Sequence, residues 1–489
     1  MTVPPRPALL AGLALLLVGG GCAPALTAAS STPAGQAAIE RAVQTALARA
    51  GLAPPAAAAP AGAGRLAAGP MLADVTARGA AVWVQTDGPA EVTLTVRAEG
   101  GAEVVQTVTA ATSADGTATV RLDDLEPGQT YGYAVEVNGQ AVSFPYPTAF
   151  TTQDLWQWRT DPPAFTVAFG SCYYDNDPPY DRPGRPYGGP TAIFETIRQA
   201  RPDLMLWLGD NVYLREVDWW SAGGIAHRYA HNRAEPDLQP LLAAAPHYAT
   251  WDDHDYGPNN ADRSYILKGE TLDAFTRYWP AAARGLPGVP GVFTHFQWGD
   301  VEFFLLDDRY HRAPNDAPAP EQTVLGREQL QWLLDALTGS DAPFKVVAFG
   351  GQFLNPVPVF ETYAAVAPAE RAFLLDQLRL RAVDGVVFLS GDRHHAELLK
   401  LDRPGAYPLY EFTSSPLTAG VSDAALDPGS PEAANPLRVP GTLVADRHNF
   451  GTLSVSGPRT DRTLTMRALD AEGAVLWERA VRAAELRTP

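Results

Sequence analysis

Short runs of alternating hydrophobic and polar residues occupy the chain from about residue 69 to residue 152. Runs of period two that are separated by Gly, Pro and Asp, with no helical period, are typical of antiparallel strands. We therefore predict a small N-terminal β-sandwich over residues 67–152. The runs that carry this prediction are AAVWVQT, EVTLTVRAE, ATVRLDDL, TYGYAVEV and VSFPYPTAF.

Continuous apolar runs alternate with helical segments after residue 160. Strands that are apolar on both sides are buried on both faces, which indicates a layered α/β body. We predict an α/β/β/α domain over 160–489, in which 451–457 and 462–482 complete the second sheet. The strand runs are FTVAFGSC, DLMLWLGD, HYATWDDHD, VEFFLLDD, FKVVAFGG, GVVFLSGD and LYEFTSS. Helices are predicted within 191–200, 267–279, 326–337 and 369–382.

The first 22 residues have the order of an export signal: one arginine, an apolar stretch from Ala8 to about Val18, then small residues. The stretch is too short to span a bilayer. It ends at Cys22, as in a lipoprotein signal, so we expect an exported chain that is lipid-anchored at Cys22, or alternatively secreted. Residues 23–66 are rich in Ala and Pro and predict a tether, interrupted by one short helical patch.

Composition narrows the function classes. The chain has 489 residues, 46% of them hydrophobic, and a formal net charge of −18. A net negative charge argues against binding to nucleic acid or to an anionic membrane, because both of these bind positively charged protein surfaces. An anionic substrate would need local cations at its site, supplied either by metal ions or by clustered arginine.

Residue types that bind metal ions follow several of the apolar runs directly. Cys172 ends the first run of the α/β body, Asp210 and Tyr213 follow the second, and WDDHD at 251–255 and GDRHH at 391–395 follow two more. In open α/β sheets the ligand crevice lies outside the carboxyl ends of the strands, so these side chains are expected to converge on one site.

The ligand types indicate more than one ion. Carboxylates and a phenolate favour hard cations, while thiolate and imidazole favour a transition metal. A carboxylate such as Asp210 can bridge two ions, and such a centre lowers the pKa of bound water and stabilises a developing oxyanion. Cys172 is then a metal-bound thiolate. A bridge to Cys22, the other of the two cysteines, and a plain buried thiol are the alternatives.

The ordered set GSC, GDNVY, WDDHD followed by NN, GREQLQWL and SGDRHH resembles the PhoD-type alkaline phosphatases of the calcineurin-like metallophosphoesterase superfamily. The resemblance covers most of residues 160–455. It implies a two-sheet sandwich with flanking helices, a centre of Fe(III) and Ca(II), and hydrolysis of phosphate monoesters and often diesters at alkaline pH. The stretch LDDLEPGQTYGYAVEVNG ahead of it resembles the fibronectin type III pattern.

The resemblance also implies roles for single residues. Cys172 and Tyr213 would be iron ligands, and Asp210 would bridge the metals. Asp253 takes a metal-ligand position, and His254 faces the phosphate or the leaving group. In SGDRHH, the resemblance implies Asp392 for the calcium side and His394 for the iron.

Several further residues are candidates for contacts to substrate or to the metal ligands. The superfamily's metal-binding histidine after VVAFG is missing, and Gln352 or Asn355 is a substitute. Substrate and supporting contacts are expected from Arg393, Arg309, Arg312, Asn259 and Asn260. Each arginine can alternatively pair with a neighbouring aspartate. The insertion at 174–190 is either a lid over the site or an ordinary surface loop.

These patterns favour an exported phosphoesterase in which a metal-bridging hydroxide attacks phosphorus and His254 and Arg393 assist. The nearest alternative is a phosphodiesterase or phospholipase specificity. Two further alternatives are a lipid-anchored binding protein with an inactive metal site and a protein with a redox centre. A histidine beside the metals that ligates nothing argues against the binding protein, and carboxylates that hold a second ion argue against the redox centre.

Overall fold

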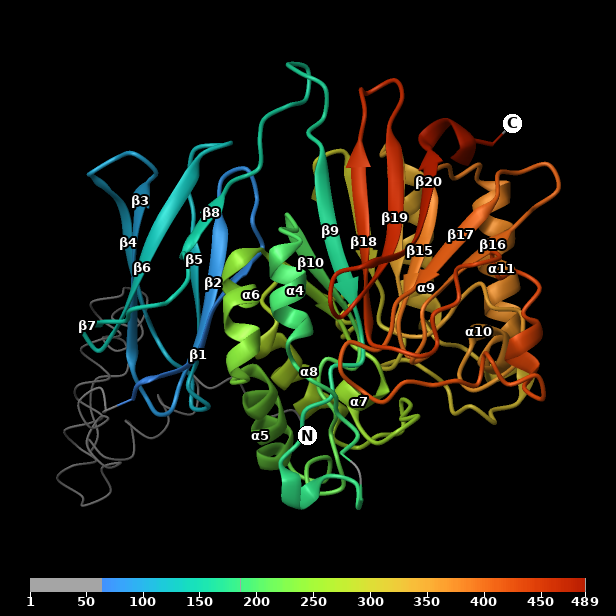
Figure 1. Ribbon diagram of the computed structural model, residues 1–489, viewed down its shortest axis with the longest axis horizontal. Coiled ribbons are helices and arrows are strands. Elements are labelled where there is room, and N and C mark those ends of the chain that lie inside the picture. The colour runs from blue at the N-terminus through green and yellow to red at the C-terminus, as the bar shows by residue number, and fades with distance from the viewer. Residues whose placement is uncertain (1–63, 185, 489) are drawn as a thin grey trace, which may run out of the picture. The chain divides into compact units, whose positions relative to one another are not determined.

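The computed structural model describes residues 64–184 and 186–488 (Figure 1). The predicted signal, Cys22 and the predicted tether up to residue 63, with its helical patch, lie outside the described residues. The tether was predicted to reach residue 66, but Leu66 already belongs to β1 (Leu66–Ala73). Within the described ranges, no helix combines the length and the apolar character needed to cross a membrane.

The N-terminal part is built from two antiparallel sheets. One sheet has the order β1-β2-β5 and the other β4-β3-β6-β7, with β8 paired to β6. Inward-facing residues such as Val82, Val92, Leu94 and Tyr131 form their common core. The bounds are β1 Leu66–Ala73, β2 Ala80–Thr86, β3 Glu91–Ala98, β4 Val104–Ala111, β5 Thr117–Leu122, β6 Thr130–Val137, β7 Gln140–Ala141 and β8 Ala149–Thr151.

Most of the strands predicted here are confirmed, but two differences stand out. The run 142–150 is wrong as a strand, because only its last two residues pair, in β8. Its prolines at 145 and 147 have no N–H for a ladder, which explains the failure. Strands β1 and β4 were not predicted, although β4 contains the valines Val104, Val105 and Val108. The likeness to fibronectin type III stays a prediction.

The rest of the chain forms a mixed α/β body with two six-stranded sheets, as predicted from the apolar runs. Their orders are β11-β10-β9-β18-β19-β20 and β12-β13-β14-β15-β17-β16. The assignment of 451–457 and 462–482 to the second sheet is wrong, because β18 pairs with β9 and these C-terminal strands complete the first sheet. Strands β9, β10 and β11 run parallel in the first sheet, and β13, β14, β15 and β17 run parallel in the second. The bounds are β9 Phe165–Gly170, β10 Leu204–Leu208, β11 His247–Thr250, β12 Thr294–Trp298, β13 Val301–Leu305, β14 Phe344–Ala348, β15 Val386–Ser390, β16 Glu397–Leu401, β17 Leu409–Thr413, β18 Asn449–Ser456, β19 Thr463–Asp470 and β20 Val475–Arg482.

The two sheets share one core. Phe169 of the first sheet packs edge-on against Phe412 of the second, with ring centroids 4.8 Å apart, and Trp477 lies 4.4 Å from Phe412. Helices α9 and α11 contribute leucines to this cluster on the second sheet. Helices α4, α5, α6 and α8 pack with the first sheet in a separate cluster. Burial on both faces explains why the strands read as continuous apolar runs.

The four predicted helical segments correspond closely to α4, α8, α9 and α11, whereas α5, α6, α7 and α10 were not predicted. Helix α5 is the longest of the missed helices. That helix contains two glycines and a buried arginine, so it shows no clear apolar face in the sequence. The bounds are α4 Ile193–Gln199, α5 Ala222–Arg233, α6 Gln239–Ala244, α7 Asp253–Tyr256, α8 Lys268–Tyr278, α9 Gly326–Gly339, α10 Tyr363–Val366 and α11 Pro368–Leu380. The short 3₁₀ turns are Pro178–Tyr180, Pro236–Leu238, Ala319–Glu321, Pro431–Ala434 and Ala483–Leu486.

The sandwich is joined to the α/β body by buried contacts. The indole N–H of Trp83 donates to the carbonyl of Arg277 at 2.8 Å, and the amide of Gln85 donates to the hydroxyl of Tyr278 at 2.8 Å. These contacts lie within one compact unit. The division into domains at 67–152 and 160–489 stays a prediction.

Candidate metal centre

The carboxyl ends of parallel strands from both sheets meet at one edge of the α/β body. Cys172 follows β9, Asp210 follows β10 and Asp392 follows β15. Gly391 makes the close approach possible, because a Cβ there would lie 2.3 Å from Oγ of Ser171. The strand ends that sequence reasoning expected to converge do meet in space.

Four residues at these strand ends hold left-handed backbone conformations. Their φ angles are +60° at Cys172, +51° at Asp210, +64° at Asp392 and +56° at His394. Non-glycine residues rarely adopt this region, and each instance costs on the order of 1–3 kcal/mol. Such strain persists only where surrounding structure imposes it, and it clusters at functional sites.

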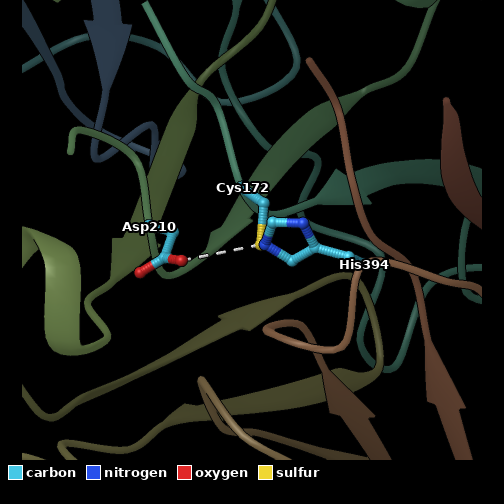
Figure 2. A group of neighbouring side chains, drawn as sticks. All are labelled: Cys172, Asp210 and His394. Atoms are coloured by element: carbon cyan, nitrogen blue, oxygen red, sulfur yellow. Dashed lines mark hydrogen bonds between the residues drawn. The ribbon is translucent and has the colours of Figure 1, made fainter. Parts of the chain in front are cut away.

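One group of ligand atoms is formed by Cys172, Asp210 and His394, which converge in Figure 2. Sγ of Cys172 lies 3.7 Å from Oδ2 of Asp210. The hydroxyl of Ser415 donates to the same sulfur at 3.1 Å. Tyr213 reaches this group from the segment after β10, and its hydroxyl oxygen lies 3.2 Å from Nε2 of His394. Thiol, phenol, carboxyl and imidazole are therefore within reach of a single ion.

A second group is formed by Asp210, Asp253 and His254, so the two groups share Asp210. Asp253 is the first residue of α7. Its Oδ1 accepts from the backbone N–H of His254 at 2.9 Å, and its Oδ2 accepts from that of Asn260 at 2.7 Å. Ligand atoms within each group lie within 4.8 Å of one another. A carboxylate common to two ligand groups is the arrangement expected for a pair of bridged ions.

Both groups border a cavity of about 490 Å³. Asp392 lines it but falls outside both ligand groups. Arg393 lines it too, with its guanidinium paired to Glu432 and 3.6 Å from Oδ2 of Asp392. Other residues that line the cavity are Arg182, Tyr187, Asp210, Asp253, His254, Asn259, Asn260, Phe360, Glu361, His394 and Val421.

Electrostatics indicate that these residues fit cations. Burial, with the nearby charges of Asp253 and Cys172, raises the pKa of Asp210 well above its usual range. Burial also raises the pKa of Cys172 to about 12, and that of Tyr213 well above its usual range. Nδ1 of buried His254 finds no hydrogen-bond partner in the described part of the chain. Bound cations reverse such shifts and stabilise the deprotonated ligands.

Four predicted contact residues do not line the cavity: Arg309, Arg312, Gln352 and Asn355. The guanidinium of Arg309 is buried against Asp252 and Glu361, and its Nε lies 2.5 Å from Oδ1 of Asp252. The side-chain amide of Gln352 is also buried, and it donates to Glu397 and Thr413 at 2.8 Å each. Arg309 therefore takes the alternative stated above, an ion pair with neighbouring carboxylates.

Sequence reasoning missed four residues that surround the ligands. Tyr187 comes from the 174–190 insertion, and its hydroxyl lies 3.2 Å from Nδ1 of His394. Ser415 bonds the sulfur of Cys172, while Phe360 and Glu361 line the cavity. An aromatic-rich insertion beside a predicted ligand was a signal for Tyr187. Ser415 ends the predicted strand run LYEFTSS, so its strand-end position was a signal too, whereas no local motif marks Phe360 and Glu361.

Comparisons with known proteins decide the family. Residues 171–464 match the model of the PhoD-like phosphatases, and this match spans more than half of the chain. The chain belongs to the PhoD-like phosphatase family. The resemblance drawn from the motifs is thereby confirmed. Residues 63–155 match a domain of unknown function, DUF7800, which covers the N-terminal sandwich.

A curated relative agrees with the PhoD-like assignment. Alkaline phosphatase D of Bacillus subtilis (strain 168) is 26% identical over 330 residues, which are 56% of this chain and 52% of that protein. The chain thus spans about half the length of the curated relative it matches.

Two solved structures are similar in fold. A structure of PhoD aligns with a TM-score of 0.68 and 19% identity over 84% of this chain and 91% of that one. A purple acid phosphatase from yellow lupin seeds aligns with a TM-score of 0.58 and 13% identity over 84% and 74%. At these identities the likeness concerns the fold alone.

Proposed function

We propose that this PhoD-like protein is a metal-dependent phosphoesterase that hydrolyses phosphate monoesters, and diesters as well. The observation that carries the proposal is the pair of ligand groups that share Asp210 at the wall of the cavity. Family membership supports it further. The alternative of a non-catalytic binding protein has no comparable support.

The residues present suit two different ions. Cys172, Tyr213 and His394 would hold Fe(III), Asp253 and Asp392 would hold Ca(II), and Asp210 would serve both. This division follows ligand softness, since thiolate and imidazole suit a transition metal and carboxylates suit calcium. When bound, the ions would supply positive charge against the phosphoryl oxygens and lower the pKa of a water molecule.

His254 would protonate the leaving oxygen. Its backbone N–H is held by Oδ1 of Asp253 at 2.9 Å, and its ring packs 4.3 Å from that of Tyr213. Because the ring packs against Tyr213 and His254 lines the cavity, the imidazole is available to a bound substrate. A positioned general acid contributes roughly 10²–10⁴-fold in rate.

Arg393 would orient the phosphoryl group. Its guanidinium is anchored by Glu432, while its Nε is buried and meets no hydrogen-bond acceptor among the described residues. Because Arg393 lines the cavity, an N–H group of its guanidinium that Glu432 does not take can donate to a phosphoryl oxygen. Asn259 and Asn260 lie across the cavity, where exposed amides are available to the same oxygens.

The rim of the cavity favours an ester with an apolar part. Phe360 is 68% exposed there, beneath the guanidinium of Arg393 at 4.7 Å, and Val421 is also exposed. An exposed aromatic ring beside a charged site gives an apolar leaving group or second ester arm a contact surface. This feature supports the diesterase or phospholipase alternative.

A hydrolysis assay tests the proposal. The metal-loaded protein is compared with His254→Ala on p-nitrophenyl phosphate, its bis-ester and phenyl phosphate. We expect a roughly 10²–10⁴-fold lower kcat in the variant on phenyl phosphate and a smaller loss on p-nitrophenyl phosphate, whose leaving group needs less protonation. The monoester-to-diester ratio of the wild type ranks the two specificities. A loaded wild type that hydrolyses none of the three esters contradicts the proposal.

We also propose that the chain is exported and anchored through a lipid on Cys22. The sequence order of residues 1–22 supports this proposal. Labelled fatty acid fed to the producing cells should be incorporated into the wild type and not into Cys22→Ser. Equal labelling of both chains, or none in either, contradicts a lipid at this cysteine.

A further inference from the structure

Helix α5 carries two histidines one turn apart. His227 and His231 are separated by four positions, which places them on the same face of a helix, and their ring centroids lie 6.0 Å apart. The chain segment opposite this face is Asp175–Asp177, at the start of the 174–190 insertion. Sequence reasoning singled out neither histidine.

Three side chains in this region present ligand atoms to a common point. Nε2 of His227 lies 3.1 Å from Oδ2 of Asp177, and Nδ1 of His231 lies 3.4 Å from Oδ1 of the same carboxylate. One ligand atom from each of the three residues lies within 4.8 Å of the other two. Zinc bonds of about 2.0–2.2 Å place tetrahedral ligands roughly 3.3–3.5 Å apart, so only small side-chain shifts are needed.

Asp175 occupies the position of a supporting carboxylate. Its Oδ2 lies 3.1 Å from Nε2 of His231, the ring nitrogen that does not face Asp177. Histidines that bind metals usually have their other nitrogen fixed by a carboxylate, which sets the tautomer and the ring orientation. The chain therefore offers both a ligand and its orienting partner.

Arg228 organises the region without any metal. Its buried guanidinium binds Asp218 at 3.0 Å and the side chain of Asn176 at 2.6 Å, and it reaches Oδ2 of Asp177 at 3.4 Å. This holds the segment against α5 before any ion arrives. Three carboxylates against one guanidinium leave two negative charges when the imidazoles are neutral, which attracts a dication. His227 is exposed, so an ion has access from solvent.

We propose that Asp177, His227 and His231, oriented by Asp175, form a second metal site that takes a divalent transition metal such as Zn²⁺. Two imidazoles and a carboxylate are ligands that zinc prefers, and a water molecule would complete a tetrahedral set. The site has no ligand in common with the two groups that contain Asp210. It goes beyond the proposed hydrolysis and does not depend on it.

The same insertion connects this site to the cavity. Tyr174, directly before Asp175, packs its ring 4.9 Å from that of Tyr213, and Tyr187 contacts His394. A metal at α5 would therefore stiffen the segment that covers two of the proposed catalytic ligands. The bound metal would then hold the insertion in place as one wall of the cavity.

The experiment measures how many Co²⁺ ions each chain binds. Co²⁺ can replace zinc in such sites and is detected by its visible absorption. Full-length wild type, His227→Ala and His231→Ala are dialysed against the same Co²⁺ concentrations, with His295→Ala as control. His295 is likewise an exposed histidine paired with one carboxylate, Glu302 at 3.1 Å. We expect both α5 variants to bind one equivalent fewer than the wild type and the control. Asp175→Asn should bind the same ion about 10–100-fold more weakly.

A second readout does not involve activity. Tyr180, 53% exposed within the insertion, is a chymotrypsin site, and Zn²⁺ should slow its cleavage in the wild type and the control but not in His227→Ala. Circular dichroism establishes that the variants are folded. Equal Co²⁺ binding by all chains, or equal zinc protection of Tyr180, would overturn the proposal and leave the histidines as hydrogen-bond partners of the aspartates.

Discussion

The hydroxyl oxygen of Tyr213 lies 3.2 Å from Nε2 of His394, although 181 positions separate them in the chain. Tyr213 follows a strand of the first sheet, and His394 follows a strand of the second. The contact therefore spans the two sheets at the edge where their carboxyl ends meet. It places a phenol and an imidazole beside the thiol of Cys172.

Tyr213→Phe tests this relationship. The substitution removes the phenolate oxygen and keeps the ring, which packs 4.9 Å from that of Tyr174. We expect the visible absorption band of an iron–phenolate centre to disappear, and the hydrolysis rate to fall about 10–100-fold. Absorption spectra of the iron-loaded chains give the result. A band that persists in the variant would exclude Tyr213 as the iron ligand.

Arg309→Met tests whether this arginine is structural. The side chain is 1% exposed and paired with Asp252 and Glu361, so its loss leaves buried carboxylates without a counter-charge. We expect the free energy of unfolding to fall by about 3–5 kcal/mol in urea titrations. Arg198→Met, which breaks an exposed pair with Glu195, should cost less than about 1 kcal/mol. A stable Arg309→Met chain with a raised KM would instead indicate a substrate contact.

Gly391→Ala tests how closely the two sheets approach. The added Cβ would lie 2.3 Å from Oγ of Ser171 and 2.9 Å from the carbonyl oxygen of Leu208. We expect a loss of about 1–3 kcal/mol in unfolding free energy, because backbone must shift. Gly269→Ala in α8 is the control, since nothing lies within 4 Å of its Cβ and a helix gains about 1 kcal/mol from the change. Equal stability of both variants would contradict the close approach.

Glu411 gives a test by pH. Burial raises the pKa of Glu411 to about 7, from 4.5, even though the backbone N–H groups of Phe353 and Leu354 donate to it. The folded chain thus holds this proton more tightly than the unfolded chain. The resulting stabilisation is complete below pH 4.5 and is lost as the pH rises through about 7.

Glu411→Gln removes that titration. From pH 4.5 to pH 7, the unfolding free energy of the wild type should fall by about 3 kcal/mol relative to the variant. Urea titrations at several pH values over this range measure the difference. A difference that stays constant with pH would show that Glu411 is ionised throughout.

Much of the fold could be predicted because each signal was local. Strands buried on both faces read as apolar runs, and residues such as Asp210 and Asp392 follow them directly. The partners of these residues could not be predicted in the same way. Phe360 and Glu361 reach the site only through tertiary packing, and no spacing in the sequence marks them. Arg309 is the opposite case. Its position after a strand predicted a contact to substrate, but its guanidinium forms ion pairs with Asp252 and Glu361.

Helix α5 shows where hydrophobic patterns fail. Its two glycines and Arg228 interrupt the pattern of apolar residues on its buried face. Arg228 can nevertheless be buried, because it forms ion pairs with Asp218 and Asp177. The pairing partners come from different loops, so the sequence does not show that the charge is neutralised. Buried polar networks of this kind, and with them the proposed second metal site, become visible only in three dimensions.

The most direct test of the central claim is the metal content and activity of Asp210→Asn. Asp210 belongs to both ligand groups, so its loss should weaken the binding of both ions. Asp335→Asn, which changes an exposed aspartate paired with Arg381, is the control. We predict that Asp210→Asn loses bound metal measured by elemental analysis and hydrolyses p-nitrophenyl phosphate roughly 100-fold or more slowly, while the control matches the wild type. A folded Asp210→Asn chain with the metal content and rate of the wild type would contradict the account.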